Sequence, residues 1–419
     1  MHQSTNQHHV IMSDKRITTR IVATTNLAEP LLGSVAGGAK HVDKVWRWGE
    51  DNMLPYALSL MARNSTAHRR IINDKADYIA GKGLTFSDTS PLLRQIVDRA
   101  NGNGDTLRSV IARLALDEAM FGNAFMEVVT NSEHSFLSLY HVDASTCRLA
   151  RDSEHVVMHH NWGSFNAQEA HSLPLYPTFE LQEDGTLRSM VHYKDYEPMF
   201  SHYGVAPYIA GLNAAAIIYK TDKWNISRIN HSFQLSGIMM LDSVAESEAE
   251  ADRLARMAEE RFAGEPGQVL FVLRDKAEGD NSQFIPINTS SDGDWQSLHE
   301  QSVSDLIVAH SWFRSLSGLD YSSGFSTDRI LHEYEVALNT IILSEQEQLL
   351  EPIRTIIYNI LCVDASSLAI INRPPTRSKP IYMRIWEARK ADGLEYDEND
   401  PEQQRFLAEI TKYNIRSIE

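Results

Sequence analysis

The sequence has few cysteines, no long apolar run and no recognisable leader. Its two cysteines, Cys147 and Cys362, lie far apart, which excludes a disulfide scaffold and the paired-cysteine spacing of a zinc ribbon. The most apolar long stretch, residues 205–219, is interrupted by Pro207 and Gly211. It is also shorter than the ~20 residues of a membrane-spanning helix. The first residues lack the apolar core of a signal peptide. We therefore expect reduced thiols and no membrane-spanning helix.

Positive charge is scarce as well. The 39 Lys and Arg residues face 56 Asp and Glu residues, so the formal net charge is −17. This balance excludes a protein that coats DNA over its whole surface, although a local basic patch could still touch DNA. Hydrophobic residues make up 42% and charged residues 23% of the chain, which excludes wholesale disorder and fibrous structure. The length of 419 residues predicts roughly two to four structural units.

Motifs of enzyme chemistry are missing. The Gly-rich stretch Gly33–Lys40 resembles a phosphate-binding loop, but Ala39 precedes its lysine and His41 replaces the hydroxyl residue. His332-Glu333 lacks the second histidine of a zinc-protease helix. No nucleophile elbow of the GxSxG type occurs. We therefore expect no catalytic residue, no bound cofactor and no enzymatic activity.

The 17 histidines raise the question of a metal site. His159 and His160 are adjacent in a segment that reads as a β-strand. Neighbouring residues of a strand point to opposite faces, so these two rings should not share one ion. The sequence thus predicts no metal site.

The first half of the chain passes from a polar arm to helices and then to strands. Residues 1–45 are polar and rich in small residues, which predicts a flexible arm. Helical patterns follow at residues 54–63, 66–80 and 105–121. Short alternating segments with polar turns fill residues 124–193, which predicts antiparallel strands. A helix of about 27 residues is expected next, at residues 207–233.

The second half contains a small charged module between helices. Residues 237–288 read as a β-α-β-β unit, and residues 242–282 carry 11 acidic and 5 basic residues. A helix is expected at 295–313, a Gly/Ser-rich break at 315–326, and a long helix to about 361. Pro352 should kink that helix or split it. Residues 381–387 read as a strand.

Several phrases stand in a fixed order along this pattern: MFGNAFME (120–127), YGVAPYIAGLNAAA (203–216), NHSFQLSGIM (230–239), FSTD (325–328) and QLLEP (348–352). Their order and spacing resemble the portal proteins of tailed double-stranded DNA bacteriophages, over residues 46–362. The resemblance implies an α+β, portal-like fold with a β-rich wing, long stem helices, a small α/β clip and a long kinked helix.

The resemblance also implies a division of the chain. Its expected parts are a flexible N-terminal arm (1–45), the wing (46–203), the first stem helix (204–235), the clip (236–290), the second stem helix (291–314), the tunnel loop (315–326), the long kinked helix (327–363) and a C-terminal wing or short crown (364–419).

The function that this resemblance implies is structural. Portal proteins form a ring, usually of twelve subunits, at one capsid vertex, through which double-stranded DNA is packaged and ejected. The expected partners are therefore DNA, the terminase large subunit that carries the ATPase, head-completion or adaptor proteins, and capsid and scaffold proteins, with no membrane. The expected location is the virion, and the host cytoplasm during assembly.

Two groups of residues are candidates for contact with DNA. Lys220, Lys223 and Arg228, with Asp222, give the first stem helix a local net charge of +2; the alternative is that they pair with acidic groups of a neighbouring subunit. Leu319, Asp320 and Tyr321 lie in the Gly/Ser-rich break, which the resemblance places at the narrowest point of the channel; the alternative is a plain surface connection.

For the whole chain, the alternative is an oligomeric enzyme or scaffold of unknown chemistry that assembles through a helical hairpin.

Overall fold

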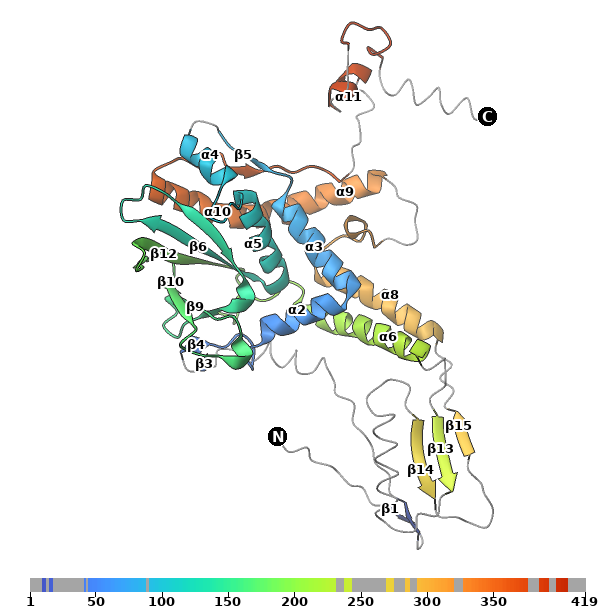
Figure 1. Cartoon of the computed structure of the whole chain (residues 1–419). Coiled ribbons are helices and arrows are strands. Elements are labelled where there is room, and N and C mark those ends of the chain that lie inside the picture. Colours follow the sequence, from blue (N-terminus) through green and yellow to red (C-terminus); the bar gives the residue numbers. More distant parts are fainter. Residues whose placement is uncertain are drawn as a thin grey trace. The chain divides into compact units, whose positions relative to one another are not determined.

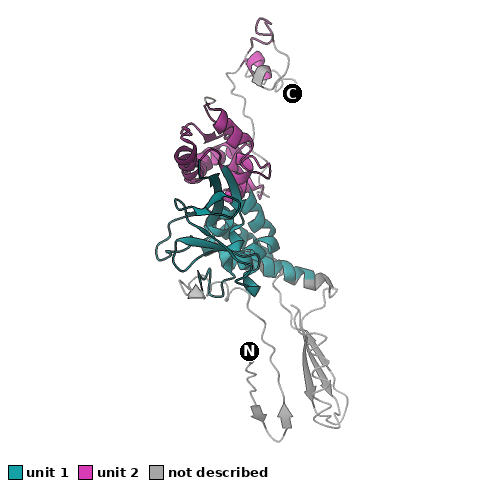
Figure 2. Ribbon diagram, turned by 60° about the vertical axis from the view of Figure 1, so that its left-hand side comes forward, with its two compact units in different colours: residues 1–73, 116–133, 138–311 teal, residues 74–115, 134–137, 312–419 magenta. Residues whose placement is uncertain are grey.

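The computed structural model describes most of the chain between residues 44 and 405. The described ranges are 44–87, 90–230, 237–242, 269–274, 283–286, 292–319, 327–375, 384–391 and 397–405, with short strands at 10–12, 15–17 and 41–42. The chain forms two compact units (Figure 2): residues 1–73, 116–133 and 138–311 in unit 1, and residues 74–115, 134–137 and 312–419 in unit 2. The division falls within two helices, α3 (Thr66–Ala80) and α5 (Leu107–Phe121).

Unit 1 contains a four-stranded antiparallel sheet in the order β11-β12-β6-β7 (Figure 1). Its strands are β6 (Asn123–Asn131), β7 (Ser138–Val142), β11 (Glu180–Leu181) and β12 (Thr186–Lys194). In β6 every residue except Glu127 and Asn131 is buried, so this strand is covered on both faces. The β-rich character expected for residues 124–193 is present.

A second antiparallel sheet of unit 1 has the order β10-β9-β8. It is built from β8 (Cys147–Leu149), β9 (His155–Met158) and β10 (His171–Pro174). A short pair, β3 (His41–Val42) and β4 (Val45–Trp46), precedes it in sequence. Val45 packs with Ala150 and Val157 in a small buried cluster.

The helices of unit 1 include α2 (Leu54–Asn64), the first part of α3, α6 (Leu212–Asn230) and α8 (Asp292–Ala309). The expected long helix at 207–233 begins later than predicted, because residues before Leu212 make tighter i→i+3 bonds. Ile209 N donates to Ala206 O at 2.9 Å and Gly211 N to Tyr208 O at 2.7 Å, which forms the 3₁₀ turn η3 (Ile209–Gly211).

The module expected at residues 237–288 contains a three-stranded sheet in the order β14-β13-β15. The strand β13 (Gly237–Asp242) runs parallel to β14 (Val269–Arg274) and antiparallel to β15 (Gln283–Pro286). A parallel pair needs a crossover connection. The helix predicted for that connection lies outside the described residues.

Unit 2 is mainly helical. Besides parts of α3 and α5, it contains α4 (Pro91–Asp98), α9 (Thr327–Ala337), α10 (Leu343–Leu361), α11 (Ile385–Ala391) and the 3₁₀ turn η4 (Ser315–Ser317). A two-stranded sheet pairs β5 (Leu84–Thr85) with β16 (Ala369–Ile370). Gln346 Nε2 donates to Ile79 O at 2.9 Å, so a side chain of α10 satisfies a carbonyl at the end of α3.

The long C-terminal helical pattern departs from α geometry at a different place from the one predicted. Residues Leu338–Ile342 form a π-helical segment between α9 and α10, whereas α10 runs unbroken through Pro352. Asn339 Nδ2 donates to Glu335 O at 2.8 Å, and Thr340 Oγ1 donates to Val336 O at 2.7 Å. These side chains compete for main-chain carbonyls at the wide turn. Of the two outcomes predicted for Pro352, the split is therefore wrong, and the kink stays a prediction.

The strand predicted for residues 381–387 is also wrong where the structure describes it. Ile385, Trp386 and Glu387 form the first turn of α11. Glu387 Oε2 accepts a bond of 2.8 Å from Arg384 N, as the acidic residue of a capping box does. This local bond favours the helix over the alternating apolar pattern.

Candidate functional site

The helices α6 and α8 pack against each other in unit 1 (Figure 1), and α6 carries the predicted cationic residues. Just before α6, Gly211 of the turn η3 lies against the end of α8, where an added Cβ would lie 2.6 Å from Ala309 Cβ. Only glycine fits at such a contact. A side chain at position 211 would push η3 away from α8.

Lys220 and Lys223 both expose their side chains on α6. Residues three apart in a helix are neighbours on its surface. The Lys223 ammonium also lies 5.2 Å from the centre of the Tyr219 ring, a cation–π distance. Between the helices, His299 Nε2 lies 3.8 Å from Asp222 Oδ1. The structure thus places Lys220 and Lys223 on the exposed surface of α6, and their contact with DNA stays a prediction.

The other predicted contact residues are placed only in part. Arg228 belongs to α6, and its side chain lies outside the described residues. Leu319, in unit 2, is buried with 8% of its surface exposed, and its N–H donates to Arg314 O at 3.2 Å. Asp320 and Tyr321 lie outside the described residues. Contact of this loop with DNA stays a prediction.

Asn123 carries a buried amide and is not among the candidate residues predicted from the sequence. Its Nδ2 donates to Phe121 O and to Gly204 O, both at 2.9 Å, and its Oδ1 accepts from Gly204 N at 2.8 Å. His192 Nε2 lies 2.9 Å from the same oxygen. All the hydrogen-bonding capacity of the amide is used. The two segments that contain MFGNAFME and YGVAPY are joined by the bonds between Asn123 and Gly204. These two phrases were therefore the sequence signal for this contact.

Two glycines make this meeting possible. Gly122 has a φ of +64°, and an added Cβ would lie 2.1 Å from Val205 O. An added Cβ at Gly204 would lie 2.1 Å from Gly122 O. The backbones therefore touch directly, which no larger residue permits. This explains physically why both phrases contain a glycine.

Arg148 is a buried cation bound by uncharged oxygens. Its Nε and Nη2 donate to Asn52 Oδ1 at 2.6 Å and to Asn52 O at 2.7 Å, and its Nη1 donates to Cys147 O at 2.7 Å. The guanidinium carbon lies 5.4 Å from the Trp48 ring centre and 4.9 Å from that of Trp162. Burial lowers the pKa of Arg148 to about 10, so it stays charged at neutral pH. Through these bonds Arg148 attaches strand β8 to the loop at Asn52.

Two buried histidines meet within unit 1. His68 Nδ1 lies 3.0 Å from His310 Nε2, and the Tyr208 ring stacks on His310 with centres 4.6 Å apart. Burial, and then the charge of Arg69, lower the pKa of His68 to about 4. Its Nε2 is buried without a hydrogen-bond partner. The His68 ring is therefore neutral at pH 7.

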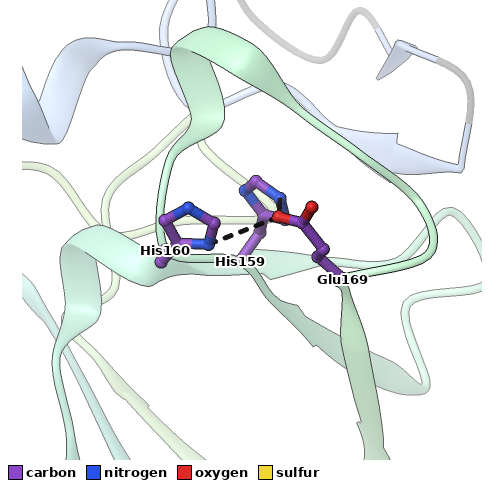
Figure 3. Close-up of side chains that lie close together, drawn as sticks. All are labelled: His159, His160 and Glu169. Atoms are coloured by element: carbon purple, nitrogen blue, oxygen red, sulfur yellow. Dashed lines mark ion pairs between the residues drawn. The ribbon is translucent and has the colours of Figure 1, made fainter.

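The prediction that His159 and His160 point to opposite faces is wrong. The strand β9 ends at Met158, so both residues lie in the following turn and their rings stack with centres 4.7 Å apart. Glu169 joins them (Figure 3). Asn161 and Gly163, which follow directly, were the sequence signal that a turn begins here.

No family model matches this sequence, and no curated protein matches it. Among solved structures, a chain from the virion of a native gene transfer agent particle has a TM-score of 0.52 and 14% identity, covering 88% of this chain and 100% of that chain. A chain from the neck of the native particle, computed with C12 symmetry, has a TM-score of 0.51 and 13% identity, covering 89% of this chain and 100% of that chain.

An HK97-family phage portal protein from Corynebacterium diphtheriae is matched with a TM-score of 0.42 and 12% identity, over 74% of this chain and 93% of that chain. In the described part of the chain, no helix is long and apolar enough to cross a membrane. At these identities the likeness is one of fold, and this chain has the mixed α+β fold of chains from the virion and neck of gene transfer agent particles.

Proposed function

We propose that this chain is the portal subunit of a phage or of a phage-like particle. The observation that carries the proposal is the fold shared with gene transfer agent chains over 87% to 89% of this chain. The C12 symmetry of one of those neck structures supports a ring of twelve copies. Double-stranded DNA passes through this ring during packaging and ejection.

The parts of the ring subunit follow the expected division of the chain. The wing is residues 46–203, the stem helices are 204–235 and 291–314, and the clip is 236–290. Support comes from α6 and α8, which fall within the two stem ranges, and from β13 to β15, which fall within the clip range. The tunnel loop (315–326) and the long helix (327–363) follow, and then a C-terminal wing or short crown (364–419).

The stem is where DNA meets the protein. Lys220 and Lys223 are exposed cations in a chain with a net charge of −17. Each cation that neutralises a phosphate adds salt-dependent affinity, so many contacts would hold DNA too tightly for translocation. A few cations on an acidic wall allow brief contacts and continued movement. The terminase large subunit supplies the ATPase, and the clip docks it and the head-completion proteins.

The test is the mass and shape of the assembled protein. Twelve copies of a 47.4 kDa chain give a ring of about 570 kDa, which native mass spectrometry and electron microscopy resolve. The full chain is purified alone and after co-expression with the capsid and scaffold proteins of the same genome. Closed rings with a central channel are expected. A small oligomer under both conditions, with turnover of a substrate, would favour the alternative of an oligomeric enzyme.

A further inference from the structure

The connection between β9 and β10 in unit 1 brings three metal-ligating side chains together. His159 and His160 follow the end of β9, and Glu169 precedes the start of β10 at His171. One ligand atom from each residue lies within 4.8 Å of the other two. Figure 3 shows the carboxylate facing both imidazole rings.

The distances suit a shared ion better than direct bonds. Glu169 Oε2 lies 3.9 Å from His159 Nε2 and 3.9 Å from His160 Nδ1. Both distances exceed the length of a hydrogen bond. Two ligands that each lie ~2.0–2.2 Å from one ion are separated by ~3–4 Å. The three donors therefore surround a position that an ion could fill after a small closure.

The surroundings hold these donors in place. Asn166 Nδ2 donates to Glu169 Oε1 at 2.9 Å, which leaves Oε2 facing the rings. The His159 side chain is fully buried, with the rings of Trp162 and Phe165 edge-on at 5.8 Å and 5.1 Å. Trp162 Nε1 donates to Thr146 O at 2.8 Å. Partners that orient ligands in this way are a regular part of metal sites.

We propose that His159 Nε2, His160 Nδ1 and Glu169 Oε2 bind a divalent transition-metal ion, with Zn²⁺ as the best fit. Two imidazoles and one carboxylate form a donor set that suits Zn²⁺ and disfavours Mg²⁺ and Ca²⁺, which take oxygen ligands. The side chains of His160 and Glu169 are 72% and 54% exposed, so the ion has a path from solvent, and water completes its coordination. The ion clamps the β9–β10 connection and performs no chemistry.

Binding requires one rearrangement. His159 Nδ1 accepts from Asn161 N at 3.0 Å, and Asn166 N lies 3.3 Å from His159 Nε2. A neutral imidazole carries one proton and accepts at one nitrogen only, so an ion at Nε2 requires the proton to be on Nδ1. The contact from the Asn161 N–H then opens, and the ion replaces the long contact from Asn166. The tautomer of His159 therefore reports on binding.

The test uses the full chain, titrated with Zn²⁺ by calorimetry and with Co²⁺ by visible absorption. The chain has 17 histidines, so background sites are measured in a matched control, His171→Ala, which removes an exposed histidine of β10. His160→Ala and Glu169→Gln change the two exposed ligands and keep the buried His159 in the chain; Glu169→Gln also keeps the stacking of the two rings. We expect each to weaken the tightest site by about tenfold or more, whereas His171→Ala leaves it unchanged.

Two further readouts separate a specific site from chance proximity. Zn²⁺ should move the ¹⁵N signals of His159 to the Nδ1–H tautomer and should raise the melting temperature of the parent chain, but not of Glu169→Gln. Mg²⁺ should do neither. Equal Zn²⁺ affinity in all four proteins, or a His159 ring that carries its proton on Nε2 at saturation, would overturn the proposal. Neither outcome bears on the portal function, which the ring experiment tests separately.

Discussion

At the residue scale, Asn123 is the amide on which three segments of unit 1 converge. Asn123→Asp keeps its shape but removes two N–H donors and places a carboxylate against the carbonyls of Phe121 and Gly204. We expect the free energy of unfolding to fall by about 3 kcal/mol or more. Urea unfolding followed by tryptophan fluorescence measures this.

Asn103→Asp is the matched control, because it makes the same chemical change at an exposed position. That variant should unfold as the parent does. If Asn123→Asp were equally harmless, the amide would not hold these segments together.

The buried pair His68 and His310 predicts a loss of stability in acid. The pKa of His68 is about 4 in the folded chain, compared with the ordinary value of 6.5 that applies to the unfolded chain. Below pH 6.5 the unfolded chain therefore binds a proton at this ring that the folded chain does not bind. The contribution of neutral His68 to the free energy of unfolding is fully present above pH 6.5 and decreases as the pH falls toward 4. The full loss is about 3 kcal/mol.

Urea unfolding between pH 7 and pH 4 checks this for the parent chain and for His68→Gln. The variant should show a weaker pH dependence, although His192, whose pKa burial lowers to about 3, still contributes. His171→Gln, at an exposed position, should keep the parent slope. An unchanged slope in His68→Gln would show that the pair is not the acid-sensitive group.

At the element scale, α6 presents Lys220 and Lys223 on its exposed surface. Under the proposed function, the double variant Lys220→Glu/Lys223→Glu should form rings normally and lose about tenfold in packaging efficiency, because two phosphate contacts become repulsive. Packaging is measured as DNase-protected DNA per particle. Rings are counted by electron microscopy.

The matched control is Arg63→Glu/Lys82→Glu, which changes the net charge equally at two other exposed positions. It should package DNA as the parent does. Normal packaging with unstable rings in the Lys220/Lys223 variant would instead mean that these cations pair with a neighbouring subunit.

At the scale of the whole molecule, the module around β13, β14 and β15 is the candidate docking surface for partner proteins. We predict that replacing residues 242–288 with a short Gly/Ser linker leaves the sheet of β6 and β12 folded but abolishes binding of terminase and head-completion proteins. Circular dichroism and unfolding check the fold, and pull-downs with each partner check docking. Retained binding of either partner would count against the assignment.

Ring assembly of the same deletion variant tests the alternative that the module is an interface between neighbouring subunits. Lost rings would indicate that the module also serves as an interface between subunits. Intact rings that fail to bind partners would identify it as a docking surface alone.

The element pattern was largely readable from the sequence because it depends on local periodicity. Apolar spacing predicted α3 at its observed bounds and α2 to within one residue, and alternation predicted the strand-rich part around β6 and β12. Patterns failed where a local bond overrode them. The bond from Arg384 N to Glu387 favours helix α11 over the predicted strand. The long helical pattern leaves α geometry at Leu338–Ile342, and it is not split at Pro352.

Tertiary structure alone decided which distant side chains meet. Asn123 with Gly204, and His68 with His310, are separated by 81 and 242 residues, and periodicity carries no information about such pairs. The cluster of His159, His160 and Glu169 depended on where β9 ends, since one further strand residue would have turned the two rings apart. The sequence by itself determined the elements and their order, because hydrophobic period and turn residues act locally. The close backbone contacts, the buried amide and the ligand cluster arose only from packing, which depends on the whole chain.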